Sequence, residues 1–262
     1  MSRRGVLALG AASISALWTA GAASGTGNRP RRALARIDRP AAPAPTPTAS
    51  PTPTVPPQSK PVYSLAEYRA VVPGDPFPPN AVALTIDDGP HPVWTPKVLD
   101  LLERYHVPAT FCLIGNQVRG HETVARSIAA AGHHVANHSY NHPTNLSGLA
   151  PEEMRDEIQR AQDKIYSATG YAPRLFRPPG GTSSPDLLAQ TTRAGMTLVD
   201  WSNDPKDWLR PGTATVTQRM LAAEPGDILL CHDGGGDRSQ THAALQTVIP
   251  ALLARGYTFV AL

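Results

Sequence analysis

The sequence predicts an α/β protein in which about seven parallel strands and their connecting helices form a distorted (β/α) barrel. Two observations predict this fold. Seven short runs between residues 81 and 262 are almost continuously apolar, which is typical of strands buried on both faces. Segments with helical spacing of apolar residues lie between most of these runs, and such alternation is typical of a parallel sheet, open or closed into a barrel. Seven strands with one helix between most pairs favour an irregular barrel. A proline-rich N-terminal region without this pattern precedes them.

The first 22 residues predict an export signal. Basic residues 3–4 precede an apolar stretch at 5–17, and residues 20–22 match an A-x-A cleavage site. A membrane anchor is the alternative, but this stretch is rich in alanine and glycine and falls short of the roughly 20 apolar residues that span a bilayer. The paired arginines also fit a twin-arginine export route. We therefore expect a secreted, cell-wall-associated protein that meets the membrane only during export.

Residues 23–60 have the composition of a linker. Nine of the 28 prolines lie between Pro40 and Pro61, and residues 41–57 are mainly proline, threonine and alanine. Such a segment has too few large apolar side chains to offset the entropy of ordering. The sequence therefore predicts a disordered, extended spacer. One folded domain is expected to follow at residues 61–262.

The net charge of +3 belongs to the region before the predicted domain. Residues 1–39 hold seven arginines and one acidic residue, whereas residues 40–262 hold 17 basic and 20 acidic residues. This distribution argues against a nucleic-acid partner, and we expect a monomer. The two cysteines, Cys112 and Cys231, fall in predicted strands and are interpreted as small buried hydrophobic residues. A disulfide between them would need Cα atoms within about 7 Å, and that alternative stays open.

The folded region begins with a predicted strand, and helices follow in alternation. A first helix is expected with Thr95 as its N-cap and Pro96 at its first position. Ser184 and the proline after it start a later helix in the same way. The last helix should be kinked at Pro250. The predicted strands are 81–87, 109–115, 133–139, 175–178, 197–202, 227–233 and 257–262, and the other predicted helices are 123–131, 151–169, 184–194 and 241–255.

Two adjacent carboxylates, Asp87 and Asp88, end the first predicted strand in the run T-I-D-D-G-P. Neighbouring residues of a strand point to opposite faces, so one carboxylate can face a metal while the other faces a reacting water. A helix cap or a turn is the purely structural alternative for such a pair.

His138 and His142 lie in the run H-S-Y-N-H-P after the third predicted strand. Histidines four residues apart can meet one metal from a single helical turn, and Pro143 disfavours a longer helix. Two histidines with a carboxylate are typical ligands of an open catalytic zinc site. A polar loop is the structural alternative. His133 and His134, upstream in the strand, are not assigned as ligands.

Three more clusters follow other predicted strands. Arg177 precedes a P-P-G-G loop, where the glycine N–H groups are expected to stay free as donors and the arginine can keep a carboxylate ionised. Asp207 and Trp208 follow the fifth strand, and His232 ends the sixth. Because chemistry gathers where the strands of such folds end, we expect all five clusters to converge.

In chain order, the runs T-I-D-D-G-P, H-S-Y-N-H-P, R-P-P-G-G, D-W and L-C-H resemble those of the polysaccharide deacetylase family, also described as carbohydrate esterase family four or the NodB-homology domain. The resemblance covers residues 81–262. It implies a distorted (β/α) barrel and the metal-dependent removal of acetyl groups from a polysaccharide. It also implies that Asp88, His138 and His142 are the metal ligands, with zinc as the expected metal and cobalt as an alternative.

The resemblance also implies roles in proton transfer. Asp87 would be the general base, and Arg177 would keep it ionised. His232 would be the general acid, supported by the carboxylate of Asp207. Separate partners for base and acid would push their pKa values apart, as a reaction needing both protonation states at one pH requires.

Three residues would shape the acyl pocket by the same resemblance. Trp208 and Leu230 would form apolar walls around the acetyl methyl group. Gly180 stands where family members usually carry an aromatic residue whose backbone N–H helps to form the oxyanion hole. Gly180 keeps the N–H but lacks the ring, so we expect a more mobile loop and a more open groove.

The leading hypothesis is a secreted N-deacetylase acting on glycans that contain N-acetylglucosamine, such as peptidoglycan or chitin-like chains. An O-acetyl esterase acting on xylan is an alternative with the same chemistry. A non-catalytic glycan-binding domain is an alternative of another class, and the presence of Asp87 and His232 argues against it.

Overall fold

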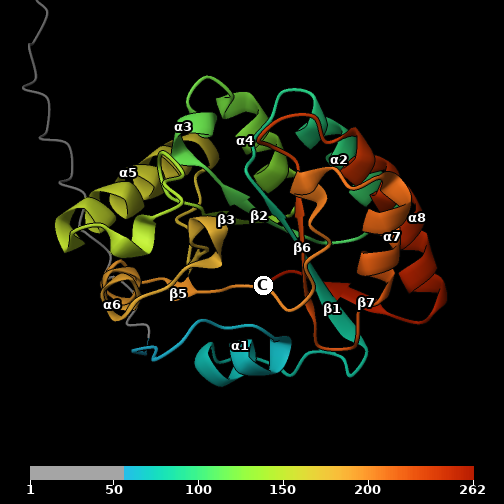
Figure 1. Cartoon of the computed structure of the whole chain (residues 1–262), viewed down its shortest axis with the longest axis horizontal. Helices are drawn as coiled ribbons and strands as arrows, with labels where there is room; N and C mark the ends of the chain where they lie inside the picture. Colours follow the sequence, from blue (N-terminus) through green and yellow to red (C-terminus); the bar gives the residue numbers. More distant parts are fainter. Residues whose placement is uncertain (1–55) are drawn as a thin grey trace, which may run out of the picture. The chain divides into compact units, whose positions relative to one another are not determined.

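A computed structural model describes residues 56–262 of the chain (Figure 1). The predicted signal peptide and residues 23–55 of the predicted linker lie outside the described residues. No helix within residues 56–262 combines the length and the apolar character needed to cross a membrane.

Seven parallel strands form one sheet in this described region, which confirms the predicted α/β fold. The strand order is β5-β4-β3-β2-β1-β6, and β7 also pairs with β1. The strands are β1 (Ala81–Asp87), β2 (Thr110–Leu113), β3 (His134–Asn137), β4 (Leu175–Phe176), β5 (Thr197–Leu198), β6 (Ile228–His232) and β7 (Thr258–Val260). All but β1 are shorter than predicted.

The distortion of the barrel lies between β5 and β6. No ladder joins these two strands within residues 56–262. Instead, Asn203 forms a single parallel bridge to Leu229 of β6, and its carbonyl accepts the N–H of Leu230 at 2.9 Å. A second single bridge joins Val62, ahead of the first helix, to Val199 just after β5. Isolated bridges thus stand where a regular barrel would have continuous ladders.

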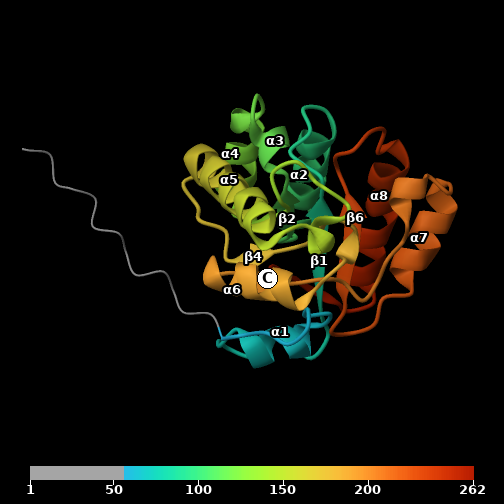
Figure 2. The same cartoon turned by 60° about the vertical axis from the view of Figure 1, so that its left-hand side comes forward.

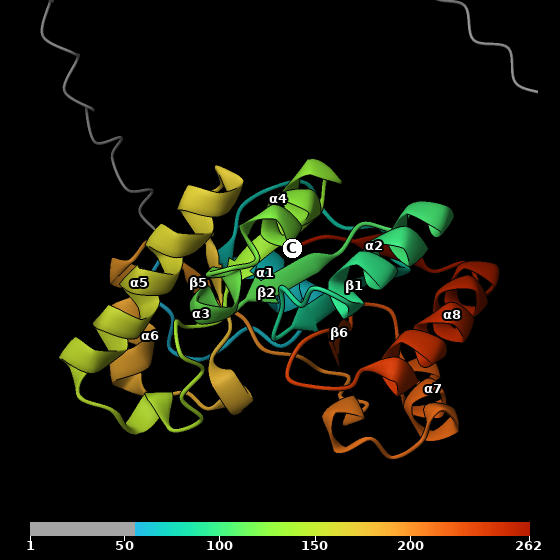
Figure 3. The ribbon, with the colours of Figure 1, turned by 90° about the horizontal axis from the view of Figure 1, so that it is seen from above.

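Helices cover the outside of the curved sheet. Figures 1 and 3 show α5 and α6 at one end of the molecule and α7 and α8 at the other. Neighbouring helices make contacts in the order α6, α5, α4, α2, α8, α7, and α1 contacts β1. Figure 2 shows α1 below the strands. The helices are α1 (Leu65–Val71), α2 (Trp94–Tyr105), α3 (Gly115–Val118), α4 (Glu122–Ala130), α5 (Pro151–Thr169), α6 (Pro185–Arg193), α7 (Thr213–Leu221) and α8 (Ser239–Ala254).

Local sequence explains the helices that were predicted. In α5 the stripe Met154, Ile158, Ala161 and Ile165 is buried, and the helix ends at Gly170 with a left-handed φ of 77°. The Ser184 hydroxyl caps α6 by accepting the Leu187 N–H at 3.2 Å. Pro250 lies inside α8.

Thr95 is not the N-cap of its helix, because α2 already begins at Trp94. The Thr95 hydroxyl instead accepts the N–H of His91 and donates to the buried carboxylate of Asp233 at 2.5 Å. Helices α1, α3 and α7 were not predicted. In α7 only Val216 and Met220 are buried, and two buried positions are too few to form a recognisable helical pattern in the sequence. Both cysteines are buried and free, as the small-hydrophobe interpretation expected.

Candidate metal and catalytic site

The five predicted clusters lie at the carboxyl ends of the strands. Asp87 is the last residue of β1, His138 follows β3, Arg177 follows β4 and His232 ends β6. Asp207 begins a short 3₁₀ turn (Asp207–Leu209) in the connection after β5. Asp87 and His232 are direct partners in the β1–β6 register, so the predicted base and acid stand side by side on neighbouring strands.

Asp88, His138 and His142 form a group suited to hold a metal. One ligand atom from each lies within 4.8 Å of the other two, the only such group that residues 56–262 contain. The Asp88 Oδ1 atom lies 3.5 Å from Nε2 of His138 and 3.3 Å from Nε2 of His142. This Oδ1 is buried and has no hydrogen-bond partner in the described region, as expected of an oxygen reserved for a cation.

The tautomer of His138 also fits a metal ligand. Its Nδ1 lies 2.7 Å from the backbone carbonyl oxygen of Arg177, which can only accept a hydrogen bond. Nδ1 therefore carries the hydrogen, and the lone pair of Nε2 faces Asp88. Two imidazoles and one carboxylate leave further coordination positions open on a zinc-like ion.

Strand alternation predicted that the two adjacent carboxylates point to opposite faces of the sheet, but in the structure both approach His138. Asp87 Oδ2 lies 3.7 Å from Nε2 of His138, the same atom that Asp88 approaches. The reason is that β1 ends at Asp87, and Asp88 leaves it with a left-handed φ of 72°. Burial opposes ionisation of Asp88, but in the metal-free chain the nearby imidazole of His138, followed by those of His232 and His142, holds the pKa of Asp88 well below the ordinary value.

His142 reaches the metal group from a loop rather than from a helical turn. Ser139 and His142 both have left-handed backbones, with φ of 62° and 60°. The buried carboxylate of Glu157 on α5 accepts hydrogen bonds from the backbone N–H groups of Tyr140 and Asn141, at 3.0 and 2.7 Å, and from the side chain of Asn141. Glu157 thereby fixes this loop. The sequence analysis did not identify Glu157. Its place next to the buried stripe of α5 could have indicated a buried acidic side chain with a structural or functional role.

The predicted base is paired as expected. Arg177 is 1% exposed, and its Nη1 donates to Oδ1 of Asp87 at 2.9 Å and to the hydroxyl of Thr85 at 2.7 Å. Its Nη2 donates to the carbonyl of Asp200. Burial alone would lower the pKa of Arg177, but Asp87 raises it above its ordinary value, so the pair is ionic. The remaining oxygen of Asp87, Oδ2, faces the metal group.

The predicted acid is also paired as expected. Nδ1 of His232 lies 2.7 Å from Oδ1 of Asp207, whose Oδ2 accepts the backbone N–H of His232 and the hydroxyl of Thr241. Burial opposes protonation of His232, but its hydrogen bond to Asp207 raises its pKa to about 9. Burial also opposes ionisation of Asp207, yet the bonds to His232 and Thr241 keep its pKa below the ordinary value. Thr241 on α8 was not predicted.

The predicted pocket residues differ in exposure. The side chain of Trp208 is 51% exposed beside Asp207, whereas Leu230 is buried inside β6. Gly180 has a φ of 69°, and apart from its chain neighbours no atom lies within 4 Å of a Cβ added there. The N–H groups of both glycines in this loop were predicted to be free donors. The prediction is wrong for Gly181, because its N–H donates to the carbonyl of Pro178.

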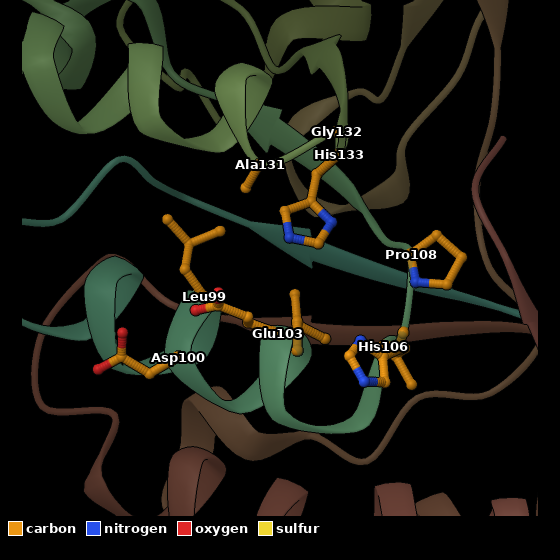
Figure 4. Close-up of a pocket in the computed structure, with 10 residues that line it drawn as sticks. Leu99, Asp100, Glu103, His106, Pro108, Ala131, Gly132 and His133 are labelled. Carbon is orange, nitrogen blue, oxygen red and sulfur yellow. The ribbon is translucent and has the colours of Figure 1, made fainter.

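A separate surface pocket of about 450 Å³ lies at the opposite ends of the strands (Figure 4). It is lined by α2 and by the segments that precede β2 and β3, including His106 and His133. The ring of His133 packs against Phe111, with ring centroids 5.5 Å apart. His133 and His134 are not part of the metal group, which agrees with leaving them unassigned.

Comparison with known proteins gives the same picture. A family model described as polysaccharide deacetylase matches residues 74–199. A chitooligosaccharide deacetylase from a Bradyrhizobium strain is 45% identical over 197 residues, covering 70% of this chain and 90% of the relative. A solved peptidoglycan N-acetylglucosamine deacetylase is 36% identical with a TM-score of 0.68, covering 71% of this chain and 88% of its own.

A third similar protein is a solved pseudoenzyme of carbohydrate esterase family four from Bacillus anthracis. It is 34% identical with a TM-score of 0.65, covering 70% of this chain and 64% of its own. The parallel-strand sheet, the group of Asp88, His138 and His142, and the buried pairs Asp87–Arg177 and His232–Asp207 fit the class of carbohydrate deacetylases. This chain belongs to the polysaccharide deacetylase family.

Proposed function

We propose that this protein is an exported, cell-wall-associated N-deacetylase that removes acetyl groups from glycans containing N-acetylglucosamine, with peptidoglycan or chitin-like chains as substrates. Relatives named for both polymers support this substrate class. The proposed metal is Zn²⁺, with Co²⁺ as an alternative. The proposed domain order is signal peptide 1–22, linker 23–60 and catalytic domain 61–262.

The observation that carries the proposal is the pair of separately supported proton-transfer groups beside one metal-binding group. Asp87 is held by Arg177, and His232 is held by Asp207. Because Asp87 and His232 are register partners, both side chains start from the same edge of the sheet, beside the metal-binding group.

Asp88, His138 and His142 would hold the metal ion. When bound, the metal supplies Lewis-acid polarisation of the acetyl carbonyl and lowers the pKa of water. Asp87 takes a proton from the attacking water through Oδ2, while Arg177 occupies Oδ1. The water oxygen bonds to the carbonyl carbon. The N–H of Gly180 is proposed to donate to the oxygen that becomes negative.

His232 then gives its proton to the sugar nitrogen as the carbon–nitrogen bond breaks. An unprotonated amine is a poor leaving group, so this step needs the imidazolium that Asp207 stabilises. Acetate and the free amino sugar are the products. Trp208 and Leu230 are proposed to contact the acetyl methyl group.

Acetate release by the full chain tests the proposal. The substrates are N-acetyl-chitooligosaccharide, peptidoglycan and acetylxylan, each with Zn²⁺, with Co²⁺ and after chelation. Acetate from an N-acetylated polymer, lost in Asp87→Asn and after chelation, is the expected result. Acetate from acetylxylan alone would favour the O-acetyl esterase. No acetate from any substrate, with metal bound, would favour a non-catalytic glycan-binding domain.

A further inference from the structure

The glycine-rich connection after β6 packs directly against the proposed metal ligand Asp88. A Cβ added at Gly234 would lie 1.9 Å from the backbone oxygen of Asp88, and one at Gly235 would lie 2.8 Å from its Oδ2. Neither position can therefore carry a side chain without displacing Asp88. This closeness explains the two glycines, whereas a Cβ at Gly236 would meet nothing within 4 Å.

Arg238 closes this connection over Asp88. The residue is 5% exposed, and its Nε donates to the carbonyl of Gly234 at 2.5 Å while Nη2 donates to that of Gly235 at 3.3 Å. The same Nη2 lies 3.9 Å from Oδ2 of Asp88. The guanidinium thus holds the loop and faces the carboxylate at once.

The two oxygens of Asp88 consequently lie in different surroundings. Oδ1 faces His138 and His142 and has no hydrogen-bond partner among the residues described. Oδ2 faces Arg238 and Gly235. Asp88 has a left-handed φ of 72°, which is uncommon for residues other than glycine although aspartate adopts it more readily than most. The close packing of Gly234 and Gly235 against its backbone and side chain surrounds it in this conformation.

We propose that Arg238, Gly234 and Gly235 form a clamp that positions Asp88 for metal binding. The clamp engages Oδ2 and presents Oδ1 alone to the ion, and so sets metal affinity and coordination geometry. Arg238 acts through Asp88 and is a positioning residue. The proposal rests on the proposed metal site. Groups that orient a metal ligand in this way typically change metal affinity by about 10–100-fold when removed.

The first test compares Arg238→Met and Arg238→Lys with the wild-type full chain. Zn²⁺ dissociation constants are measured by competition with a chromogenic chelator, and the Co²⁺ absorption spectrum reports coordination geometry. We expect Arg238→Met to weaken Zn²⁺ binding at least 10-fold and to alter the Co²⁺ spectrum. Arg238→Lys keeps the charge but loses the fork of donors, so an intermediate affinity is expected.

The second test uses two neighbouring glycines as a matched pair. Gly235 and Gly236 both have positive φ, of 70° and 129°, so alanine strains the backbone at either position. Only the new methyl group at position 235 points at Asp88 and Arg238. We expect Gly235→Ala to weaken Zn²⁺ binding and Gly236→Ala to bind Zn²⁺ as the wild type does.

The outcomes separate the clamp from the proposed function. A folded Arg238→Met with wild-type Zn²⁺ affinity and Co²⁺ spectrum overturns the clamp. If Arg238→Met does not fold, equal affinities of Gly235→Ala and Gly236→Ala overturn it instead. A wild-type chain that binds no metal refutes the proposed metal site itself. Metal binding without acetate release contradicts the proposed deacetylase and leaves the clamp to be judged on affinity.

Discussion

The protonation of His232 depends on one buried carboxylate. Asp207 accepts both the ring and the backbone N–H of His232, and the pKa of the imidazole is raised to about 9. In the metal-free chain we expect the His232 ring, followed by NMR, to titrate near pH 9. Asp207→Asn should move this pKa down toward the ordinary value of about 6.5. An unchanged titration in Asp207→Asn would refute the assignment.

The same pair makes a pH-dependent contribution to stability. A histidine whose pKa is raised on folding stabilises the protein fully below its unfolded pKa of about 6.5, and this stabilisation is lost as the pH rises through about 9. In metal-free protein, the free energy of unfolding should therefore fall between these pH values. Asp207→Asn should flatten that fall, as urea denaturation at several pH values would measure.

Arg177 is the charged side chain whose removal should cost the most stability. It donates to Asp87, to Thr85 and to two backbone carbonyls from a position 1% exposed. Arg177→Met leaves Asp87 buried without a counter-charge and should lower the free energy of unfolding by about 3–5 kcal/mol. Arg210→Met, which breaks an exposed ion pair with Asp237, is the control and should change it far less. Equal urea midpoints for the two variants would contradict this account.

The polar residues of the site could be predicted from the sequence because they lie at or after the ends of strands, and the strands are recognisable as apolar runs. Of their supports, Arg177 and Asp207 were predicted through the family resemblance, but two others were not. Glu157 and Thr241 lie on helices far away in sequence, and only the packing of α5 and α8 brings them to the histidine loop and to Asp207. The orientation of Asp88 was predicted incorrectly, because strand alternation stops where the backbone turns left-handed.

At the scale of elements, helix α5 serves the site as a support. Glu157→Ala removes the acceptor of two backbone N–H groups in the loop that carries His142. We expect roughly 2 kcal/mol of lost stability and a Zn²⁺ affinity lowered about 10-fold. Glu152→Ala, on the exposed face of the same helix, should change neither. Thermal denaturation and chelator competition test both, and matching values for the two variants would show that Glu157 has no such role.

Helices with a full apolar stripe were predictable, and sparse ones were not. The buried positions of α5 repeat over four turns, so its bounds of 151–169 agree with the prediction. Helix α7 buries only two residues, and α3 is a single turn of four residues directly after β2, so neither has a helical apolar stripe. The lengths of the strands were overestimated because the apolar runs extend beyond the residues that form the strands.

At the scale of the whole molecule, the fold extends beyond the segment that the family model matches. Residues 58–72 precede that segment, yet Val62, Leu65 and Tyr68 are buried and Val62 exchanges hydrogen bonds with Leu198 and Asp200. Leu65→Ala should therefore cost about 2–5 kcal/mol. Tyr63→Ala, at a side chain 38% exposed, is the control. Similar melting temperatures for both variants would show that this segment adds no stability.

The barrel class was predictable from strand–helix alternation, but its closure was not. Each of the two bridges, Asn203 to Leu229 and Val62 to Val199, joins a residue outside the predicted strands to a residue inside one. They depend on how far β5 and β6 diverge, which is a property of the assembled sheet and not of any one stretch of sequence.

The burial of both cysteines makes the protein well suited to site-specific attachment. Cys112 and Cys231 are the only thiols of the chain, they pair in register with Asp87 and Ile86 of β1, and burial raises their pKa values well above the ordinary value. A maleimide would find neither in the native state, because the reactive thiolate is neither formed nor accessible. Glu103→Cys, exposed beside the pocket of Figure 4, would then offer a single anchoring point for a dye or a solid support. Because that position lies at the strand ends opposite the proposed catalytic groups, the immobilised protein would keep the proposed active site toward a glycan in solution.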